Sequence, residues 1–481
     1  MLLDTLNRHV ILPAVAAKRG SRHLRFLRQL ERTQFDPPEV VRERQFRMLT
    51  AALQHAWDTV PFYRRTWAAA GVHPSDVKSF ADLRHFPVVT KADIRAHGRE
   101  MVSAVYAGQK LRVKTTSGST GVPLAISIDE PAVQWKYACT LRADQWSGYR
   151  LGQRVAKVWG NPEYRQFGLR GRVANAVVDR AVYLDTLNLT PARIAEFTAA
   201  VRRHRPGLIF GHAHSLYLLA CQMKKAGVTD VRPNGIISTA MPLHDWQRSV
   251  IEEVFGVPAT NRYGCEEVSL IACECEKHRG LHVAAESVFT EVEIQPLPPT
   301  PSPKRRGGEN KASCSPLRFG EGPGEGLYGN LLLTDLVNFA MPLIRYRVGD
   351  VVTATDRRCE CGRGLPLLEA IQGREADYVV TPAGGLISGI SLTENFAMHI
   401  PGAAQVQIVQ ETRTHLRVRL VVDDAFTDAS RRKIAELVAE MFGPTMRYDV
   451  ELVDLIPQEP SGKYRFCISK VAADYLKELS A

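Results

Sequence analysis

Apolar residues recur at helical spacing through the first hundred residues of the chain. The spacing predicts helices over Glu39–Thr59 and Tyr63–Ala70. Pro61 and the stretch Gly71–Pro74 interrupt the pattern, because proline and glycine end helices. A further amphipathic helix is expected within the basic stretch Lys18–Arg32. We expect its charged face to be solvated, and a role at a membrane surface or on a partner is the alternative.

From about residue 111 onward, short strand-like runs alternate with helical patterns. The strand-like runs are Arg154–Trp159, Gly207–Phe210 and Gly235–Ser238, and the helical patterns are Thr190–His204, Ser215–Ala226 and His244–Val254. Such alternation is typical of parallel strands joined by helical crossovers. The sequence therefore predicts an α/β fold in which mostly parallel sheets are covered by helices.

Residues 296–326 depart from this pattern. The segment holds seven prolines and six glycines in 31 residues. Because it offers little apolar surface to bury, we expect it to be disordered. It lies between the strand-like runs Ser287–Ile294 and Tyr328–Thr334, which predicts an insertion into a surface hairpin loop, where extra length costs little.

The pattern changes again after Gly373. The runs Gln405–Gln410, Leu416–Val422, Ser430–Met441 and Asp449–Leu455 predict a strand–strand–helix–strand order. We expect a large N-terminal domain over residues 1–373, with a helical region over 1–100, and a small α+β domain over 374–481.

The composition is that of a globular protein. Of the 481 residues 45% are hydrophobic and 23% are charged, which excludes a disordered, collagenous or coiled-coil chain. No run of about 18 apolar residues occurs, so no stable membrane insertion is expected. The apolar stretch Val10–Ala17 is too short for a secretory signal, and we expect a cytoplasmic location. The net charge of +11 fits an ordinary basic enzyme, an anionic substrate or a nucleic acid.

The clearest chemical signal is the segment Thr115–Pro123, with the sequence TTSGSTGVP. A loop rich in glycine and hydroxyl residues offers backbone N–H groups and hydroxyls to phosphate oxygens. It is not a Walker A loop, because no Gly-Lys-Ser/Thr closes it. Taken alone, the segment is also compatible with a flexible linker.

Four further motifs follow along the chain. They are YGCEE at Tyr263–Glu267, RYRVGD at Arg345–Asp350, GREAD at Gly373–Asp377 and PSGKYR at Pro460–Arg465. Each alone is weak, since RYRVGD can be a salt-bridged strand end and PSGKYR an exposed turn. All five in this order are hard to assign to chance.

With these five motifs the chain resembles the adenylate-forming (AMP-binding) acyl/aryl-acid ligase superfamily. It is most similar to the phenylacetate–coenzyme A ligase branch, including its capsular-polysaccharide-associated members. The resemblance implies that a carboxylate attacks the α-phosphate of Mg·ATP and that a thiol, normally of coenzyme A, then displaces AMP. It also implies that the C-terminal domain is a mobile lid with a hinge near Gly373.

The resemblance further implies the role of each motif residue. Glu267 would hold Mg²⁺, Asp350 the ribose hydroxyls, and Lys463 the α-phosphate and the attacking carboxylate. Glu267, Lys463 and Thr120 would be catalytic. The implied nucleotide-binding residues are Thr116, Ser117, Gly118, Ser119, Thr120 and Gly121 at the phosphates, Thr239, Ala240, Tyr263 and Gly264 at the adenine, Asp350 and Arg374 at the ribose, and Lys463.

Three departures from the family pattern concern this site. Glu266 stands where relatives commonly carry a hydroxyl residue, and it adds a negative charge beside the expected metal. The acidic pair after the hinge is interrupted, as Glu375-Ala376-Asp377. The segment Thr239–Pro242 replaces a Gly-Ala-Glu-Pro type of segment beside the adenine.

The nine cysteines argue against a disulfide scaffold, because the count is odd in a long chain. Cys139, Cys221 and Cys467 lie among apolar residues and are expected to be buried thiols. Cys273, Cys275, Cys359 and Cys361, together with His278 and His282, form a further group of possible metal ligands. This group predicts a closed, structural Zn²⁺ site, which the resemblance supports. The predicted ligands are Cys275, His282, Cys359 and Cys361, with His278 and Cys273 as the alternatives to His282 and Cys275.

The acid is expected between the sheet and the segment Trp135–Gly160. Aromatic residues in this region suit an aryl acid, although each of them alone is better explained as a core residue. The phenylacetate type of acid is what the resemblance implies. The aromatic candidates are Trp146, Tyr149, Trp159 and Tyr217.

The expected partners are therefore ATP, a small carboxylic acid and coenzyme A, and the sequence also allows a homodimer. One alternative is an adenylating enzyme with another acceptor, namely a sugar, an amine or a carrier protein. A second is a nucleic-acid-binding protein with a zinc module, which leaves the phosphate loop unexplained. A third is an inactive relative, which the presence of Glu267, Asp350 and Lys463 disfavours.

We predict that Lys463→Ala abolishes adenylate formation and leaves the fold intact, because one flexible cation is expected to stabilise the transition state. Acid-dependent exchange of pyrophosphate into ATP measures the activity, and circular dichroism checks the fold. Exchange at the wild-type rate would contradict the assignment.

Overall fold

The computed structural model is described here for most of the chain. The described residues are 2–116, 124–159, 168, 171, 174–184, 191–240, 242–294, 327–374, 378–383, 386–388, 392, 396, 399–457, 465–472, 474 and 475. The segment 296–326, for which disorder was expected, lies outside these residues.

The N-terminal region is helical, as its sequence pattern predicts. Its helices are α1 (Leu2–Leu6), α2 (Leu12–Lys18), α3 (His23–Thr33), α4 (Pro38–Thr59), α5 (Pro61–Ala69) and α6 (Lys91–His97). Proline stands in the first turn of both α4 and α5, where its missing N–H group costs nothing. Buried Leu49 and Leu53 on α4 and buried Trp67 on α5 belong to one apolar core that continues under the sheet. In α3, Leu27 and Leu30 are buried while the basic residues lie outside.

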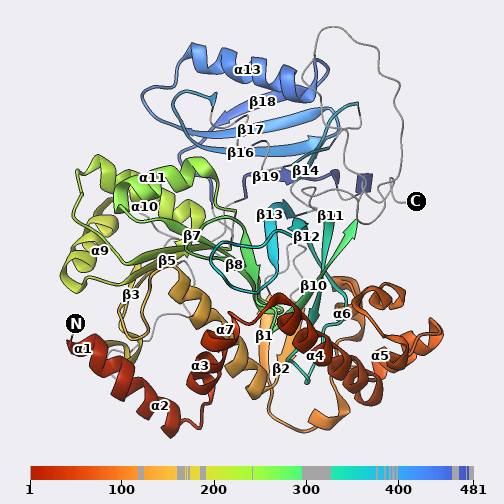
Figure 1. Ribbon diagram of the computed structural model, residues 1–481. Helices are drawn as coiled ribbons and strands as arrows, with labels where there is room; N and C mark the ends of the chain where they lie inside the picture. The colour runs from red at the N-terminus through yellow and green to blue at the C-terminus, as the bar shows by residue number, and fades with distance from the viewer. Residues whose placement is uncertain are drawn as a thin grey trace.

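An eleven-stranded mixed sheet forms the centre of the molecule (Figure 1). Its strand order is β10-β11-β12-β13-β9-β8-β7-β6-β5-β3-β4. The bounds are β3 (Val155–Val158), β4 (Ala181–Leu184), β5 (Leu208–His212), β6 (Gly235–Thr239), β7 (Ala259–Cys265), β8 (Ser269–Glu274), β9 (Leu281–Val283), β10 (Val288–Ile294), β11 (Leu327–Asp335), β12 (Tyr346–Thr355) and β13 (Leu367–Arg374). The α/β class is confirmed, but only strands β3 to β7 pair in parallel, and the rest of the sheet is antiparallel.

The parallel half is built from strands and helices close to those predicted. Its crossover helices are α9 (Pro191–His204), α10 (Ala213–Lys225) and α11 (Asp245–Phe255), which pack against β4 to β7. Strands β10 and β11 pair as neighbouring antiparallel strands, which fits the predicted hairpin around the insertion. Cys139 and Cys467 are buried as expected. Cys221, on α10, was also expected to be buried but is only half-buried.

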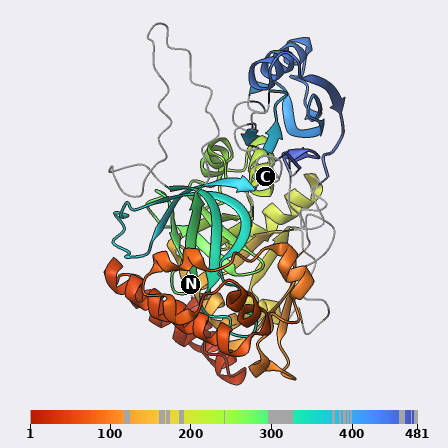
Figure 2. The same ribbon diagram turned by 90° about the vertical axis from the view of Figure 1, so that its right-hand side faces the viewer.

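The C-terminal residues form a separate four-stranded sheet with one helix. The elements are β16 (Ala403–Thr412), β17 (His415–Val422), α13 (Asp428–Phe442), β18 (Arg447–Leu452) and β19 (Cys467–Ser469), in the sheet order β18-β17-β16-β19. The strand–strand–helix–strand order therefore agrees with the sequence pattern. In both views this unit lies on the opposite side of the large sheet from the N-terminal helices (Figures 1 and 2). A separate pair of strands, β14 (Tyr378–Val380) and β15 (Leu386–Ser388), lies between β13 and this sheet in the chain.

Helix α7 (Glu130–Trp146) carries charges into the interior. The Lys136 ammonium pairs with Asp335 at 2.5 Å, and the Arg142 guanidinium pairs with Glu286 at 2.5 Å. All four side chains are at most 4% exposed. Both pairs join α7 to the antiparallel half of the sheet. No helix within the described ranges is both long and apolar enough to cross a lipid bilayer.

We predict that Glu286→Ala destabilises the protein by about 3–5 kcal/mol, because it leaves the Arg142 guanidinium buried and unpaired. Urea unfolding followed by tryptophan fluorescence measures the change. Asp230→Ala is the matched control, since it breaks the exposed Arg202–Asp230 pair and is expected to change stability little. Equal effects of the two substitutions would show that the Arg142–Glu286 pair is not buried in solution.

Candidate functional site

A two-stranded hairpin presents the predicted phosphate loop. Strands β1 (Arg112–Thr116) and β2 (Leu124–Ile128) pair in antiparallel fashion, with Thr116 opposite Leu124. The pairing fixes both ends of the connecting segment 117–123. That segment, with Ser117, Gly118, Ser119, Thr120 and Gly121, lies outside the described residues, and so does Lys463. Their roles stay predictions.

Glu267 is a buried carboxylate in the turn between β7 and β8. It is 5% exposed, and its Oε1 accepts a hydrogen bond from the Tyr346 hydroxyl at 2.9 Å. Among the described residues no lysine or arginine nitrogen forms an ion pair with it. Buried charges in proteins are paired or bind a metal ion. Glu267 therefore fits a hard cation such as Mg²⁺, which prefers carboxylate and phosphate oxygens.

Asp350 is a second buried carboxylate, on β12. It is 6% exposed, and its Oδ2 accepts a hydrogen bond from the Tyr263 hydroxyl at 2.6 Å. Residue 374 lies directly opposite Asp350 on β13. The two positions predicted to contact the ribose therefore face each other across one strand pair, while the side chain of Arg374 is not described.

The Tyr346 hydroxyl, which donates to Glu267, is influenced by the charges of both carboxylates. Burial, together with the charges of Glu267 and Asp350, raises its pKa far above the usual range. Tyr346 therefore stays protonated and acts as a donor. Tyr346 lies inside the RYRVGD motif, four residues before Asp350, but the motif alone does not indicate this role.

The predicted adenine segment follows the carboxyl end of β6. In open parallel sheets ligands bind beyond this edge of the strands. The Thr239 hydroxyl donates to the Arg262 carbonyl at 2.9 Å, and Ala240 has a φ of 67°, a strained value for a non-glycine residue. Gly264 is required in β7, because a Cβ there would lie 2.5 Å from the Ser269 carbonyl oxygen. Such backbone shapes are common where a site is built from loops.

Glu266, the departure from the family pattern, has a basic partner. The Lys114 ammonium lies 3.8 Å from Glu266 Oε2 and within 3.0 Å of the Ser269 hydroxyl. Burial lowers the pKa of Lys114, and the charge of Glu266 opposes this effect. No sequence motif marks Lys114, because a single lysine in a strand forms no recognisable pattern.

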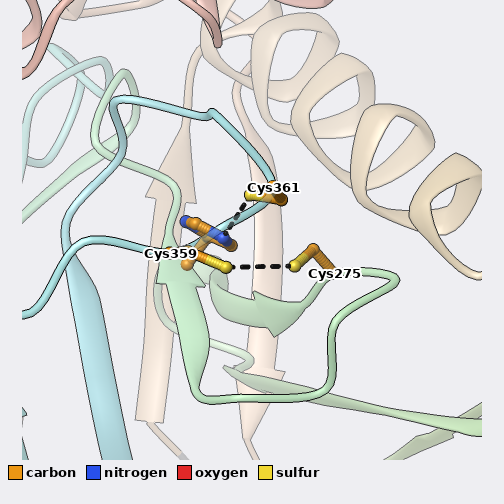
Figure 3. Close-up of side chains that lie close together, drawn as sticks. Cys275, Cys359 and Cys361 are labelled. Carbon is orange, nitrogen blue, oxygen red and sulfur yellow. Dashed lines mark hydrogen bonds between the residues drawn. The ribbon is translucent and has the colours of Figure 1, made fainter.

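The structure brings together the four predicted zinc ligands. Ligand atoms of Cys275, His282, Cys359 and Cys361 all lie within 4.8 Å of one another, and the three cysteines point toward one another (Figure 3). The Cys275 and Cys359 sulfurs are 3.7 Å apart, and Cys361 Sγ is 3.2 Å from His282 Nε2. Two thiolates on a tetrahedral zinc ion, each at about 2.3 Å, would be about 3.8 Å apart. The spacing suits a four-coordinate metal ion.

The surroundings of this cluster also suit a metal. Burial lowers the pKa of His282 to about 4, so its imidazole is neutral at neutral pH and a lone pair can bind a metal. Burial raises the pKa of Cys275 to about 12, whereas hydrogen bonds from Arg363 outweigh burial and lower the pKa of Cys361. The alternatives fall outside the cluster. The ring of His278 contacts Glu274 at 3.1 Å, and Cys273 is fully buried in the core.

The four aromatic candidates for the acid pocket lie in different places. Trp146 packs against His282 with ring centres 5.7 Å apart, Tyr149 lies in a small core with Leu208, and Tyr217 packs edge-on against Trp246. Only Trp159 follows the carboxyl end of a parallel strand. Its ring stacks on Phe210 at 5.2 Å and lies 3.8 Å from that of His212. Of the four candidates, Trp159 is therefore the one at the carboxyl edge of the parallel strands, where it packs with His212.

Comparison with known sequences shows which proteins this chain is similar to. Residues 379–470 match the model of the CapK C-terminal domain. The chain is 26% identical to the phenylacetate–coenzyme A ligase of Thermus thermophilus over 350 residues, which covers 72% of each chain. It is 22% identical to protein CapK of Staphylococcus aureus over 410 residues, which covers 81% of each chain.

Comparison with solved structures supports the fold. 2-Hydroxyisobutyryl-CoA ligase in its postadenylation state, in complex with an acyl-AMP, superposes with a TM-score of 0.68. The identity is 22%, and the match covers 94% of both chains. The same ligase in the thioesterification state superposes with a TM-score of 0.55. The fold of this chain is that of an adenylate-forming ligase.

Proposed function

Because this chain belongs to the adenylate-forming ligase superfamily, we propose that it activates a carboxylic acid with ATP and transfers the acyl group to coenzyme A with release of AMP. The observation that carries the proposal is the pair of buried carboxylates, Glu267 and Asp350, each held by a tyrosine hydroxyl beside the hairpin that leads into the phosphate loop. Relatives of similar length that are named phenylacetate–coenzyme A ligases support coenzyme A as the acyl acceptor.

In this proposal the protein acts mainly by positioning charges. The phosphate-loop residues donate hydrogen bonds to phosphate oxygens, and Asp350 accepts hydrogen bonds from the ribose hydroxyls. Mg²⁺, when bound at Glu267, would neutralise phosphate charge. Lys463 stabilises the charge that develops as the acid attacks the α-phosphate.

The C-terminal unit is proposed to act as a mobile lid over residues 374–481, hinged near Gly373. Strand β13 ends at Arg374, and the four-stranded sheet beyond it has its own apolar core. Closure would bring the segment around Lys463 to the nucleotide, since loops and domains that close over a substrate complete many active sites.

We further propose that the acid is an aryl acid of the phenylacetate type. Trp159 and His212 at the carboxyl edge of the sheet support an aromatic substrate, because the flat ring of such a substrate can pack against their rings. The names of the curated relatives point the same way.

An alternative acceptor is a sugar, an amine or a carrier protein. The observation that favours it is the match of residues 379–470 to the CapK C-terminal domain, since the residues proposed for adenylate formation do not define the acceptor.

The test is acid-dependent exchange of pyrophosphate into ATP across aryl and short acyl acids, with AMP release measured with and without coenzyme A. We expect exchange with an aryl acid, and AMP release that rises when coenzyme A is added. Exchange without a response to coenzyme A would support the alternative acceptor. Failure of every acid with folded protein would contradict the proposed function.

We also propose that Cys275, His282, Cys359 and Cys361 bind a structural zinc ion. Purified protein is expected to contain about one zinc per chain, and Cys359→Ser to lose it and to melt at a lower temperature, because removing one ligand opens the tetrahedral site. Cys139→Ser is the matched control, since Cys139 is a buried thiol outside the cluster. Elemental analysis and thermal denaturation measure both effects, and equal zinc contents in the two variants would contradict the assignment.

A further inference from the structure

Lys114 lies on the hairpin of the phosphate loop, and its side chain reaches the turn that carries Glu267. It is the third residue of β1, two positions before the strand ends at Thr116. Its ammonium contacts the Ser269 hydroxyl at 3.0 Å and lies 3.8 Å from Glu266, so it reaches the turn that carries Glu267. The Lys114 side chain is 31% exposed, whereas that of Glu266 is 64% exposed.

The phosphate loop itself has no positive charge. The segment Thr115–Pro123 contains no lysine, arginine or histidine, so it can meet a triphosphate only with hydroxyls and N–H groups. Glu266 adds a negative charge beside Glu267 and would repel an approaching polyphosphate. A cation at the edge of the loop would offset this repulsion by Glu266, in addition to the charge supplied by Mg²⁺ and Lys463.

We propose that Lys114 is this cation, and that it balances the charge of Glu266 and draws the polyphosphate of a nucleoside triphosphate to the loop. The inference rests on the proposed function and names a residue that sets its nucleotide affinity. Two other cations, Lys136 and Arg112, act on Lys114 electrostatically, and both lower its pKa. Lys136 is bound to Asp335 and Arg112 to Glu130, so Lys114 is the cation directed at Glu266.

A purely structural ion pair would behave differently. A half-exposed pair such as Lys114–Glu266 contributes little to stability, so removing it should not unfold the protein. If Lys114 served only packing, its loss would change the melting temperature and would affect ATP and acid alike. If it balances charge, its loss should affect ATP alone.

The test compares Lys114→Met, Glu266→Gln, the double variant and Arg112→Met in pyrophosphate exchange with an active acid. We expect Lys114→Met to raise the KM for ATP by roughly tenfold and to leave the KM for the acid within about twofold. The double variant should recover most of this loss, because Glu266 no longer needs a counter-charge. The effect should shrink at high salt, since screening weakens exposed charges.

Arg112→Met is the matched control. Arg112 lies on the same strand two residues earlier, and its guanidinium pairs with Glu130 at 3.7 Å. Removing this positive charge should leave the KM for ATP within about twofold. An equal effect of both substitutions would mean that only the net charge of the hairpin counts, which would overturn the assignment to Lys114.

Two further outcomes overturn the inference. One is an unchanged KM for ATP in Lys114→Met, and the other is a loss that the double variant does not recover. Calorimetric titration with MgATP separates this inference from the proposed function. If the wild type binds no MgATP, the proposed function fails and the inference fails with it. If the wild type and Lys114→Met bind MgATP equally well, only the inference fails.

Discussion

The position of helix α7 is the constraint on which the site depends. Three of its charged residues form ion pairs: Lys136 with Asp335, Arg142 with Glu286, and Asp144 with Arg262 at 2.6 Å. Asp335 ends β11 and Glu286 lies in the turn between β9 and β10, both in the antiparallel half, whereas Arg262 lies on β7, where the parallel half ends. Because a mispaired buried charge is costly, these contacts favour one placement of the helix. Strand β2 leads directly into α7, so the same contacts position the hairpin of the phosphate loop.

The candidate nucleotide site then forms where the two halves of the sheet meet. Tyr263 on β7 holds Asp350 on β12, and Tyr346 on β12 holds Glu267 after β7. Both hydrogen bonds therefore join β12 to β7 or to the turn that follows it. The hydroxyl donors lower the cost of burying the two carboxylates, which are proposed to hold Mg²⁺ and the ribose. Lys114 continues the same balance of charge at the hairpin.

The cysteine–histidine cluster lies against the C-terminal end of α7. Trp146, at the end of α7, packs against His282, and the Arg363 guanidinium stacks over Trp146 with its centre 4.8 Å from the ring. Arg363 also pairs with Glu276, which lies one residue after Cys275. The segments that carry the four candidate ligands are therefore held against α7 by aromatic and cationic contacts, and a structural metal would fix that end of the helix.

The local sequence pattern determined many of the helices and strands of this protein and their order along the chain. The amphipathic spacing of Glu39–Thr59, the runs that became β5 and β6, and the order of the C-terminal elements were all readable, because each depends on neighbours in the chain. Glu267, Asp350 and the four cysteine and histidine residues could be chosen as candidates from motifs alone. Tertiary structure alone decided that half of the sheet is antiparallel, that Tyr346 holds Glu267, that His282 rather than His278 joins the cluster, and that Lys114 faces Glu266. Those contacts join residues 79 to 155 positions apart or, for His282, depend on which way a short strand turns its side chains, and no local periodicity encodes either.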